Sequence, residues 1–328
     1  MTPLDGTSSC STPTSERRSP FLDDALSGLG ASPKRLSPKY FYDLEGSRLF
    51  DAICVLPEYY VTRTETAILD RRADEIAARL GPCRIVEPGA GSGTKTRLLL
   101  AALGKDRCRE YVPVDIDGEH LGHAAALHRA ALPWLRVSPY AADFTTALPT
   151  RVEDGTRTVV FFPGSTIGNF DPADAEQLLR RFGRAAGANG LVVVGFDLKK
   201  DPAVLHAAYN DADGVTAAFN RNVLRRMNDE LGADFDLDAF HHYAFYAPVP
   251  GRIEMHLVSA RRQEVRLGGQ TISFEDGESI CTEHSYKYDL AGAERLARAA
   301  GLRPLDRWLD DDRRFAVLSF APVSNGVS

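Results

Sequence analysis

A glycine-rich turn placed between an apolar run and a helical pattern constrains the fold of this chain more than any other feature. Residues 84–86 are expected to form a buried strand, and Gly89, Gly91 and Gly93 follow it at alternate positions. A helix is expected next, through residues 98–103. Glycines at this spacing let the backbone approach a ligand closely, and the start of the following helix presents unpaired amide groups. The sequence therefore predicts a ligand site immediately after this strand.

Strands and helices alternate on both sides of this turn. Further strands are expected at residues 110–114, 158–162 and 191–196. Asp171 followed by Pro172 is typical of a helix start between the last two. Upstream, Thr62 and Glu65 match a capping box, which predicts a helix that begins there and ends before Gly81. This alternation predicts the α/β class, with a doubly wound, mostly parallel sheet covered by helices on both faces.

The alternation breaks after residue 197. The next residues read as helices at 198–232 and then as a β-meander at 242–288. A helix at 291–300 and a strand at 315–320 then resume the α/β pattern. One α/β domain is therefore expected to be interrupted by an insertion.

The expected domain boundaries follow from this break. The α/β core comprises residues 62–196 and 287–322, and an inserted α+β substrate-binding domain comprises residues 38–61 and 197–286. Residues 1–37 are rich in Ser, Thr and Pro, which is typical of a flexible N-terminal tail. A short helix is expected within that tail near residues 21–26.

Composition argues against several kinds of partner. The 328 residues include 39 basic and 45 acidic side chains, a net charge of −6, whereas proteins that grip nucleic acid are usually basic. No run of apolar residues is long enough to span a membrane, and the first residues lack the apolar core of a signal peptide. We therefore expect a cytoplasmic protein without nucleic-acid or membrane partners. A monomer is also expected, although composition does not bear on the oligomeric state.

No metal site is expected either. The five cysteines form no CxxC pair. His120, His123 and His128 share one helical stretch, but no cysteine or acidic pattern completes a zinc motif around them, so they are expected at the surface.

The polar residues around the turn favour a particular cofactor. An acid, Glu87, stands two residues before the glycines, and this acid-x-GxGxG form is typical of S-adenosylmethionine (SAM) methyltransferases. Asp115 ends the second strand, where an acid can bind ribose hydroxyls. Asp143 and Phe144 follow a third short strand and are expected at the adenine. The predicted cofactor-binding residues are Glu87, Gly89, Gly91, Gly93, Lys95, Asp115, Asp143 and Phe144, with Lys95 at the cofactor carboxylate.

Six short motifs carry a more specific resemblance, which covers most of residues 38–322. They are YFYD (40–43), LPEYY (56–60), EPGAGSGTK (87–95), FPGSTIGNF (162–170), AAYN (207–210) and TEHSYK (282–287). With these motifs the chain resembles the SAM-dependent L-histidine Nα-methyltransferases of ergothioneine biosynthesis. Val61 departs from the proline that the family carries after the double tyrosine.

The resemblance implies a class I, Rossmann-like methyltransferase core and a set of substrate-binding residues. Asn169 and Tyr209 match positions that bind the substrate carboxylate; both are neutral donors, which orient the carboxylate without a fixed charge. Tyr42 and Gly164 match positions near the amino group, so the catalytic set is Tyr42, Gly164 and Asn169. The predicted substrate-binding set is Tyr59, Asn169, Tyr209, Met255, Glu283 and Ser285.

Residue chemistry supports the histidine pocket. Glu283 and Ser285 lie two apart on a predicted strand, so their side chains leave the same face and can hold the two nitrogens of an imidazole. A flexible thioether such as Met255 packs well against a ring. Tyr42 offers an aromatic face to an amine that becomes a fixed cation after three methylations. Alignment of the amine with the methyl donor is expected to carry most of the rate, without a strong general base.

The expected reaction is therefore the trimethylation of L-histidine to hercynine, with SAM as methyl donor. Two alternatives stay open. One is an N-methyltransferase of another amino acid or of a histidine derivative. The other is a SAM-binding module without catalytic activity, against which the complete substrate set argues.

Overall fold

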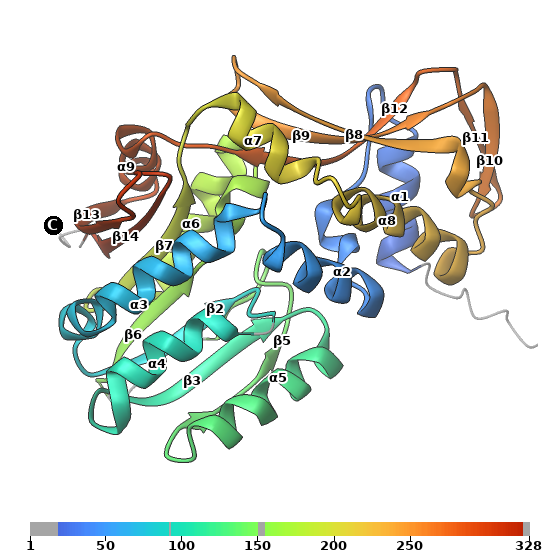
Figure 1. Cartoon of the computed structure of the whole chain (residues 1–328). Coiled ribbons are helices and arrows are strands. Elements are labelled where there is room, and N and C mark those ends of the chain that lie inside the picture. The colour runs from blue at the N-terminus through green and yellow to red at the C-terminus, as the bar shows by residue number, and fades with distance from the viewer. Residues whose placement is uncertain (1–18, 92, 150–154, 324–328) are drawn as a thin grey trace, which may run out of the picture.

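A mostly parallel eight-stranded sheet forms the larger part of the protein in a computed structural model that describes residues 19–91, 93–149 and 155–323 (Figure 1). Across the sheet the strands run in the order β13 (Leu302–Leu309), β14 (Phe315–Pro322), β7 (Leu191–Asp197), β6 (Arg157–Phe162), β2 (Cys83–Pro88), β3 (Cys108–Asp115) and β4 (Arg136–Val137), and β5 (Tyr140–Ala141) also pairs with β3. Only β14 runs antiparallel to its neighbours, β7 and β13. The expected doubly wound α/β architecture is confirmed.

Helices cover both faces of this sheet. One face carries α3 (Tyr60–Leu80), α4 (Thr94–Arg107) and α5 (Gly118–Ala131), and the other carries α6 (Pro172–Ala186) and α9 (Leu290–Ala299). Val159 of β6 packs in the same core as Leu100 of α4, whereas the next residue, Val160, packs with Phe182 of α6. Successive strand residues therefore feed two separate cores, as strand geometry requires.

A smaller α+β unit lies at one end of the large sheet (Figure 1). Its four-stranded sheet has the order β1 (Lys34–Arg35), β12 (Ser279–Tyr286), β9 (Arg252–Ser259) and β8 (Phe240–Ala247), and β10 (Gln263–Leu267) pairs separately with β11 (Gln270–Phe274). Its helices are α1 (Pro20–Leu29), η1 (Pro38–Phe41), α2 (Leu44–Val55), α7 (Pro202–Tyr209), α8 (Val215–Leu231) and η3 (Leu237–Ala239).

The two units share one continuous apolar core. Ile253 and Leu257 of the small sheet pack with Leu224 of α8, and the same buried cluster extends to Ile68 of α3 and Val193 of β7. The buried face of the small sheet is therefore held at a fixed place above the large sheet.

Two of the places where the chain passes between the two units lie side by side. The chain leaves the large sheet after Asp197 and returns after Lys287. Tyr288 N donates to Asp197 O at 3.1 Å, and Lys199 N donates to Tyr288 O at 2.8 Å. These backbone hydrogen bonds fix both crossings side by side.

The N-terminal region is more ordered than the sequence predicted. The short helix expected near residues 21–26 is confirmed as α1, with Phe21, Ala25 and Leu29 buried. β1 extends the small sheet by pairing parallel to β12. The expectation of a flexible tail is therefore wrong for residues 20–37, and residues 1–18 lie outside the described residues.

Two local expectations are also wrong. The helix α3 begins at Tyr60, and the Glu65 side chain does not cap it but lies fully buried inside the first turns. His128 is not at the surface but is 2% exposed, with its ring 4.9 Å from that of Tyr111, whereas His123 is exposed as expected. Tertiary packing, which local patterns do not report, determines both positions.

A stability measurement tests the folded state of α1. The ring of Phe21 stacks on that of Tyr40 with centroids 4.1 Å apart and is nearly buried. Phe21→Ala should therefore lower the free energy of unfolding by about 3 kcal/mol in urea denaturation. Ser27→Ala, at an exposed position of the same helix, is the control and should change it by less than about 0.5 kcal/mol. Equal stability of both variants would mean that α1 does not pack on the protein.

Candidate active site at the carboxyl ends of the parallel strands

The predicted residues gather where the central strands end. The glycine turn follows β2, Asp115 ends β3, Gly164 follows β6 and Asp197 ends β7. In doubly wound sheets ligands bind outside these carboxyl ends, at the point where the strand order reverses and the connections from two adjacent strands run to opposite sides. β2 is such a strand, because β3 and β6 flank it.

The glycine turn is supported from beneath by a buried acid. Glu87 is 2% exposed, and its carboxylate accepts hydrogen bonds from the Thr96 hydroxyl at 2.5 Å and from the Tyr111 hydroxyl. Burial raises the pKa of Glu87 to about 7, although both hydroxyls oppose that shift. Glu87 therefore connects the turn to α4, the helix that follows it, and to β3.

Of the two glycines that follow Ala90 in the turn, only Gly91 has open space beside it. A Cβ on Gly91 would meet no described atom within 4 Å, whereas a Cβ on Gly93 would lie 2.2 Å from Nε2 of His128. Both residues have positive φ, +49° and +61°, which favours glycine. Gly91 therefore borders a cradle, and Gly93 allows the turn to sit against α5.

The surroundings of this cradle fit the adenosyl part of SAM. Asp115 lies beside Gly91, whose N–H is 3.4 Å from Oδ2, and so presents an acid to ribose hydroxyls. The Phe144 ring packs against Gly89, 3.3 Å from where a Cβ would stand. The Asp143 carboxylate accepts from the backbone N–H of Thr145 at 2.8 Å, which fixes the loop that carries Phe144. These predicted cofactor residues therefore line one face of the turn.

Lys95 has a protein partner that the sequence analysis did not foresee. Its Nζ lies 2.6 Å from Oε2 of Glu65, and the same oxygen accepts the Gly164 N–H at 2.8 Å. Oε1 of Glu65 is buried without a hydrogen bond from the described residues. Glu65 thus joins the helix after the glycine turn to the loop after β6, and it places Gly164 beside Lys95.

The predicted substrate residues of the small sheet also come together. Glu283 stands opposite Met255 in the β12–β9 ladder, and both side chains are buried. The Ser285 hydroxyl accepts from the Tyr209 hydroxyl at 2.9 Å. Burial raises the pKa of Glu283 to about 7, and the charge of Lys287 partly offsets that rise. The described residues offer the Glu283 carboxylate no hydrogen bond, which leaves it available to a ligand.

An aromatic group encloses the same space. The rings of Tyr59 and Tyr209 lie 6.4 Å apart, and Phe50 contacts both Tyr59 (6.3 Å) and Tyr42 (5.7 Å). Burial raises the pKa values of the Tyr42 and Tyr59 hydroxyls, and the nearby Glu283 charge raises them further. Both phenols therefore stay protonated next to Glu283.

The loop after β6 carries Asn169 on a segment that packs against β12. η2 (Thr166–Asn169) packs against β12 so closely that a Cβ on Gly168 would lie 2.7 Å from Tyr286 O. Asn169 is half-buried, and its amide makes no hydrogen bond to the described residues. It is thus a donor and acceptor without a partner among the described residues, on a segment that packs against β12.

A buried charged cluster behind these residues was not predicted. Lys287 Nζ bonds to Asp197 Oδ2 at 2.9 Å, to Tyr209 at 3.0 Å and to Ser285 at 2.9 Å. Tyr60 donates to Asp197 at 2.8 Å. The sequence held one signal for Lys287, because it follows Ser285 by two residues and so continues the same strand face.

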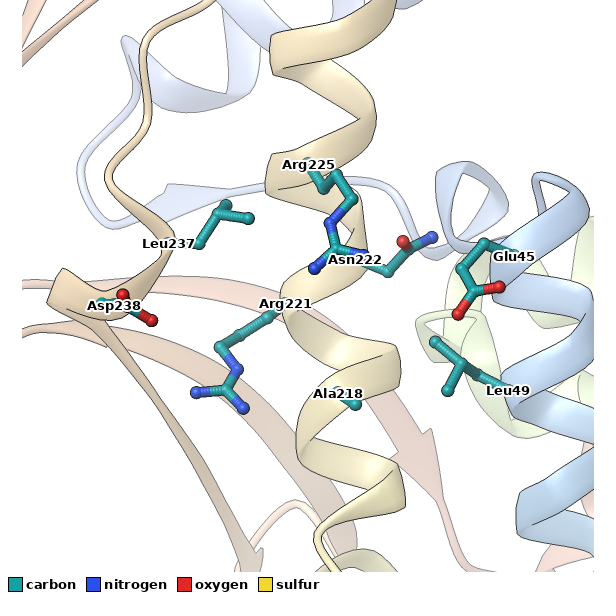
Figure 2. Close-up of a pocket in the computed structure, with 8 residues that line it drawn as sticks. All are labelled: Glu45, Leu49, Ala218, Arg221, Asn222, Arg225, Leu237 and Asp238. Carbon is teal, nitrogen blue, oxygen red and sulfur yellow. The ribbon is translucent and has the colours of Figure 1, made fainter.

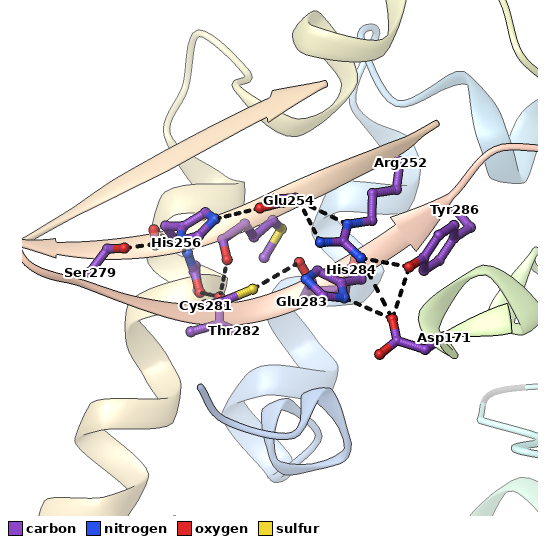
Figure 3. Close-up of polar contacts among 12 residues, drawn as sticks. Asp171, Arg252, Glu254, His256, Ser279, Cys281, Thr282, Glu283, His284 and Tyr286 are labelled. Atoms are coloured by element: carbon purple, nitrogen blue, oxygen red, sulfur yellow. Dashed lines mark hydrogen bonds and ion pairs between the residues drawn. The ribbon is translucent and has the colours of Figure 1, made fainter. Parts of the chain in front are cut away.

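The opposite face of β12 carries a separate polar group (Figure 3). Asp171, at the start of α6, accepts from the Tyr286 hydroxyl at 2.9 Å and lies 3.1 Å from Nδ1 of His284. Arg252 bonds to the Tyr286 hydroxyl at 2.6 Å and pairs with Glu254 at 2.7 Å. This group ties the small sheet to α6 from outside and faces away from Glu283 and Ser285.

A pocket of about 180 Å³ lies elsewhere, between α2, α8 and η3 (Figure 2). Its lining residues are Glu45, Leu49, Ala218, Arg221, Asn222, Arg225, Leu237 and Asp238. None of them belongs to the predicted cofactor or substrate set, so this pocket is distinct from the candidate active site.

The described residues lack two kinds of feature, a membrane-spanning helix and a cluster of metal ligands. None of their helices combines the length and apolarity needed to cross a bilayer. They also contain no group of three or more His, Cys, Asp or Glu side chains arranged to hold a metal ion.

The strand order, the lone antiparallel strand and the acid-supported glycine turn define a class I SAM-dependent methyltransferase. The model of a family described as histidine-specific, SAM-dependent methyltransferases matches residues 21–322. This chain belongs to that family.

Named relatives agree with this assignment. The chain is 43% identical over 290 residues to the Histidine N-alpha-methyltransferase of Mycolicibacterium smegmatis, with 88% of this chain and 90% of that protein covered. It is 42% identical over 297 residues to the protein of the same name from Mycobacterium tuberculosis, with 90% and 92% covered. Ergothioneine biosynthesis protein 1 of Neurospora crassa is 30% identical over 297 residues, which span 84% of this chain and 32% of that protein.

Two glycine variants should separate ligand binding from folding. Gly91→Ala places a methyl group in the open cradle, so SAM affinity measured by calorimetry should fall at least about tenfold with a modest cost in stability. Gly93→Ala drives a methyl group against the buried His128 ring, so its free energy of unfolding should fall by about 2 kcal/mol or more. Unchanged SAM affinity in Gly91→Ala would contradict the cradle.

Proposed function

We propose that this protein transfers methyl groups from SAM to the α-amino nitrogen of L-histidine, in three steps that give hercynine, as part of ergothioneine biosynthesis. The family to which the chain belongs and the names of its relatives support the substrate. The observation that carries the proposal is the free Glu283 carboxylate, buried on the same strand face as Ser285 and beside three tyrosines.

In this proposal Glu283 and Ser285 recognise the imidazole. A carboxylate only accepts hydrogen bonds, whereas a hydroxyl can donate, so the pair is complementary to a neutral ring with one N–H and one bare nitrogen. Met255 packs against the ring from the neighbouring strand. Tryptophan fits poorly, because its indole offers no acceptor nitrogen to Ser285.

Asn169 and Tyr209 would hold the substrate carboxylate. Both are neutral donors, and the Asn169 amide is not engaged by the described residues. With the carboxylate and the ring fixed at two ends, the α-amino group is restricted to the space near Tyr42 and Gly164. Such positioning supplies most of the rate in reactions that need close alignment of two groups.

When bound, SAM supplies an electrophilic methyl group on a sulfonium. The residues that would hold it are Gly89 and Gly91 at the turn, Asp115 at the ribose and Phe144 at the adenine. Lys95 is paired with Glu65 and would reach the cofactor carboxylate only while keeping or exchanging that partner.

The aromatic group has a second proposed role. Each methylation brings the amine closer to a permanent cation, and the faces of Tyr42 and Phe50 attract cations at short range. The Tyr42 and Tyr59 phenols stay neutral, since their pKa values are raised. No residue in the site needs to act as a strong base. The neutral form of the amine accepts the methyl group, and the ammonium that results can lose its proton to water before the next transfer.

The other expectations from the sequence concern the substrate, the oligomeric state, the location and the partners of the protein. L-histidine as a small-molecule substrate agrees with the family. A monomeric state, a cytoplasmic location and the lack of nucleic-acid and membrane partners stay predictions from the sequence.

A substrate panel tests the function directly. Purified protein is incubated with SAM and each of a set of amino acids, and products are identified by mass. A gain of three methyl groups on histidine alone is the expected result. Methylation of another amino acid or histidine derivative with histidine inert would favour that alternative. SAM binding without turnover of any amino acid would favour a non-catalytic module.

The pH dependence of Glu283→Gln gives a sharper test of the pocket. Because the pKa of Glu283 is about 7 before substrate binds, protonation below that pH replaces a charged acceptor for the ring N–H by a weaker neutral one, and kcat/KM for histidine should fall. Glu283→Gln should lower kcat/KM by about 100-fold. Its plot of log kcat/KM against pH should also lose one unit of slope between about pH 5 and 6.5, because one titrating group is gone.

A matched substitution serves as the control. Glu254 lies on the opposite face of the same sheet, where it pairs with Arg252 and His256. Glu254→Gln should therefore leave the histidine kinetics and the slope close to those of the unaltered protein. An unchanged slope in Glu283→Gln would remove Glu283 from the ring-binding role.

A further inference from the structure

Lys287 is the one cation in direct contact with two of the predicted substrate-binding hydroxyls, among the residues that the structure describes. Its side chain is 1% exposed, and its ammonium group reaches Tyr209, Ser285 and the Asp197 carboxylate at 2.9 to 3.0 Å. An ammonium group has three donors and no acceptor, so these contacts use all of its hydrogen atoms.

The Asp197 carboxylate keeps Lys287 charged. Burial alone would lower the pKa of Lys287, but the Asp197 carboxylate outweighs burial and raises it. Asp197 is shared, because Lys200 pairs with it too and donates to Tyr60 at 2.6 Å. Burial lowers the pKa of Lys200 to about 8, which still leaves it mostly protonated at pH 7. One carboxylate therefore faces two ammonium groups.

The direction of the hydrogen bonds follows from this contact. Lys287 can only donate, so the oxygens of Tyr209 and Ser285 must both accept from it. Their own protons must point elsewhere. The Tyr209 hydroxyl donates to Ser285 at 2.9 Å, and it can turn to a ligand at the loss of that one neutral bond, which Lys287 already duplicates at the serine oxygen.

We propose that Lys287 is a positioning residue that fixes Tyr209 as a donor to the substrate carboxylate and supplies the positive charge behind it. This inference rests on the proposed function, in which an α-amino acid places its carboxylate at Tyr209. It departs from the expectation that neutral donors alone hold this group. The consequence is a substrate class: the site selects a free α-carboxylate over an amide or an ester of the same amino acid.

Selection for charge is tested by comparing two substrates that differ only there. kcat/KM is measured for L-histidine and for L-histidinamide with the unaltered protein, Lys287→Met and Lys200→Met. The unaltered protein should prefer histidine by at least about 30-fold, as expected for a hydrogen bond backed by a charge. Lys287→Met should reduce this preference to about threefold or less. A loss of packing alone would slow both substrates equally and leave the ratio unchanged.

Lys200→Met is the matched control, because Lys200 shares Asp197 but contacts Tyr60 in place of Tyr209 and Ser285. The logarithm of its preference for L-histidine over L-histidinamide should be at least half of the value for the unaltered protein. The proposal is overturned if Lys287→Met keeps the full preference, or if both lysine variants lose it equally. It is also overturned if the unaltered protein uses both substrates equally well, a result that needs no variant.

Two safeguards keep the test decisive. Thermal unfolding shows whether Lys287→Met is folded, since removal of one partner from a buried ion pair is destabilising. If it is not, Tyr209→Phe cuts the path from Lys287 to the carboxylate and keeps the pair with Asp197; a full preference for histidine in this variant overturns the proposal. Failure of the proposed function looks different, because the unaltered protein would then methylate neither substrate.

Discussion

The buried ion pair between Asp197 and Lys287 fixes the point on which the rest of the architecture depends. Asp197 ends β7 and Lys287 follows β12, so the pair joins two of the places where the chain crosses between the large sheet and the small unit. Both side chains are removed from water, and the loss of one partner from such a pair typically costs about 3–5 kcal/mol. The same pair contacts Tyr209 and Ser285, so domain connection and substrate recognition share one set of atoms.

Two carboxylates with raised pKa values have different roles in the site, one at the glycine turn and one in the proposed substrate pocket. Glu87 has hydroxyl partners on both oxygens and supports the glycine turn, whereas Glu283 has none among the described residues and stays open to a ligand. Burial raises the pKa of each to about 7. Glu65 adds a third acid, which connects Lys95 of α4 to the Gly164 backbone. The acids that have protein partners build the scaffold, and the one without such a partner is available for recognition.

Local patterns predicted the α/β elements well because their apolar runs are buried on both faces, as in β6 and β7. They did not predict β13, in which only Leu302 and Trp308 are buried at the sheet edge, and they misassigned Glu65. Glu65 matched a capping box by spacing, but its partners lie 30 and 99 residues away. The cluster around Lys287 was missed for the same reason: its members are brought together only by the fold, although the alternation of β12 pointed to Lys287.

A β-bulge in β12 explains how one strand serves two faces. The ladder with β9 pairs Cys281 with His256 and then Glu283 with Met255, so Thr282 is the extra residue. Without the bulge, with Thr282 paired opposite Met255, Glu283 would stand opposite Glu254 on the outer face. His284 would then take the inner position of Ser285, because a shift of one residue exchanges the faces of a strand. Bulges often redirect side chains next to active sites. Here the bulge turns an acid, a hydroxyl and a lysine inward, and it leaves His284 and Tyr286 to anchor α6 through Asp171.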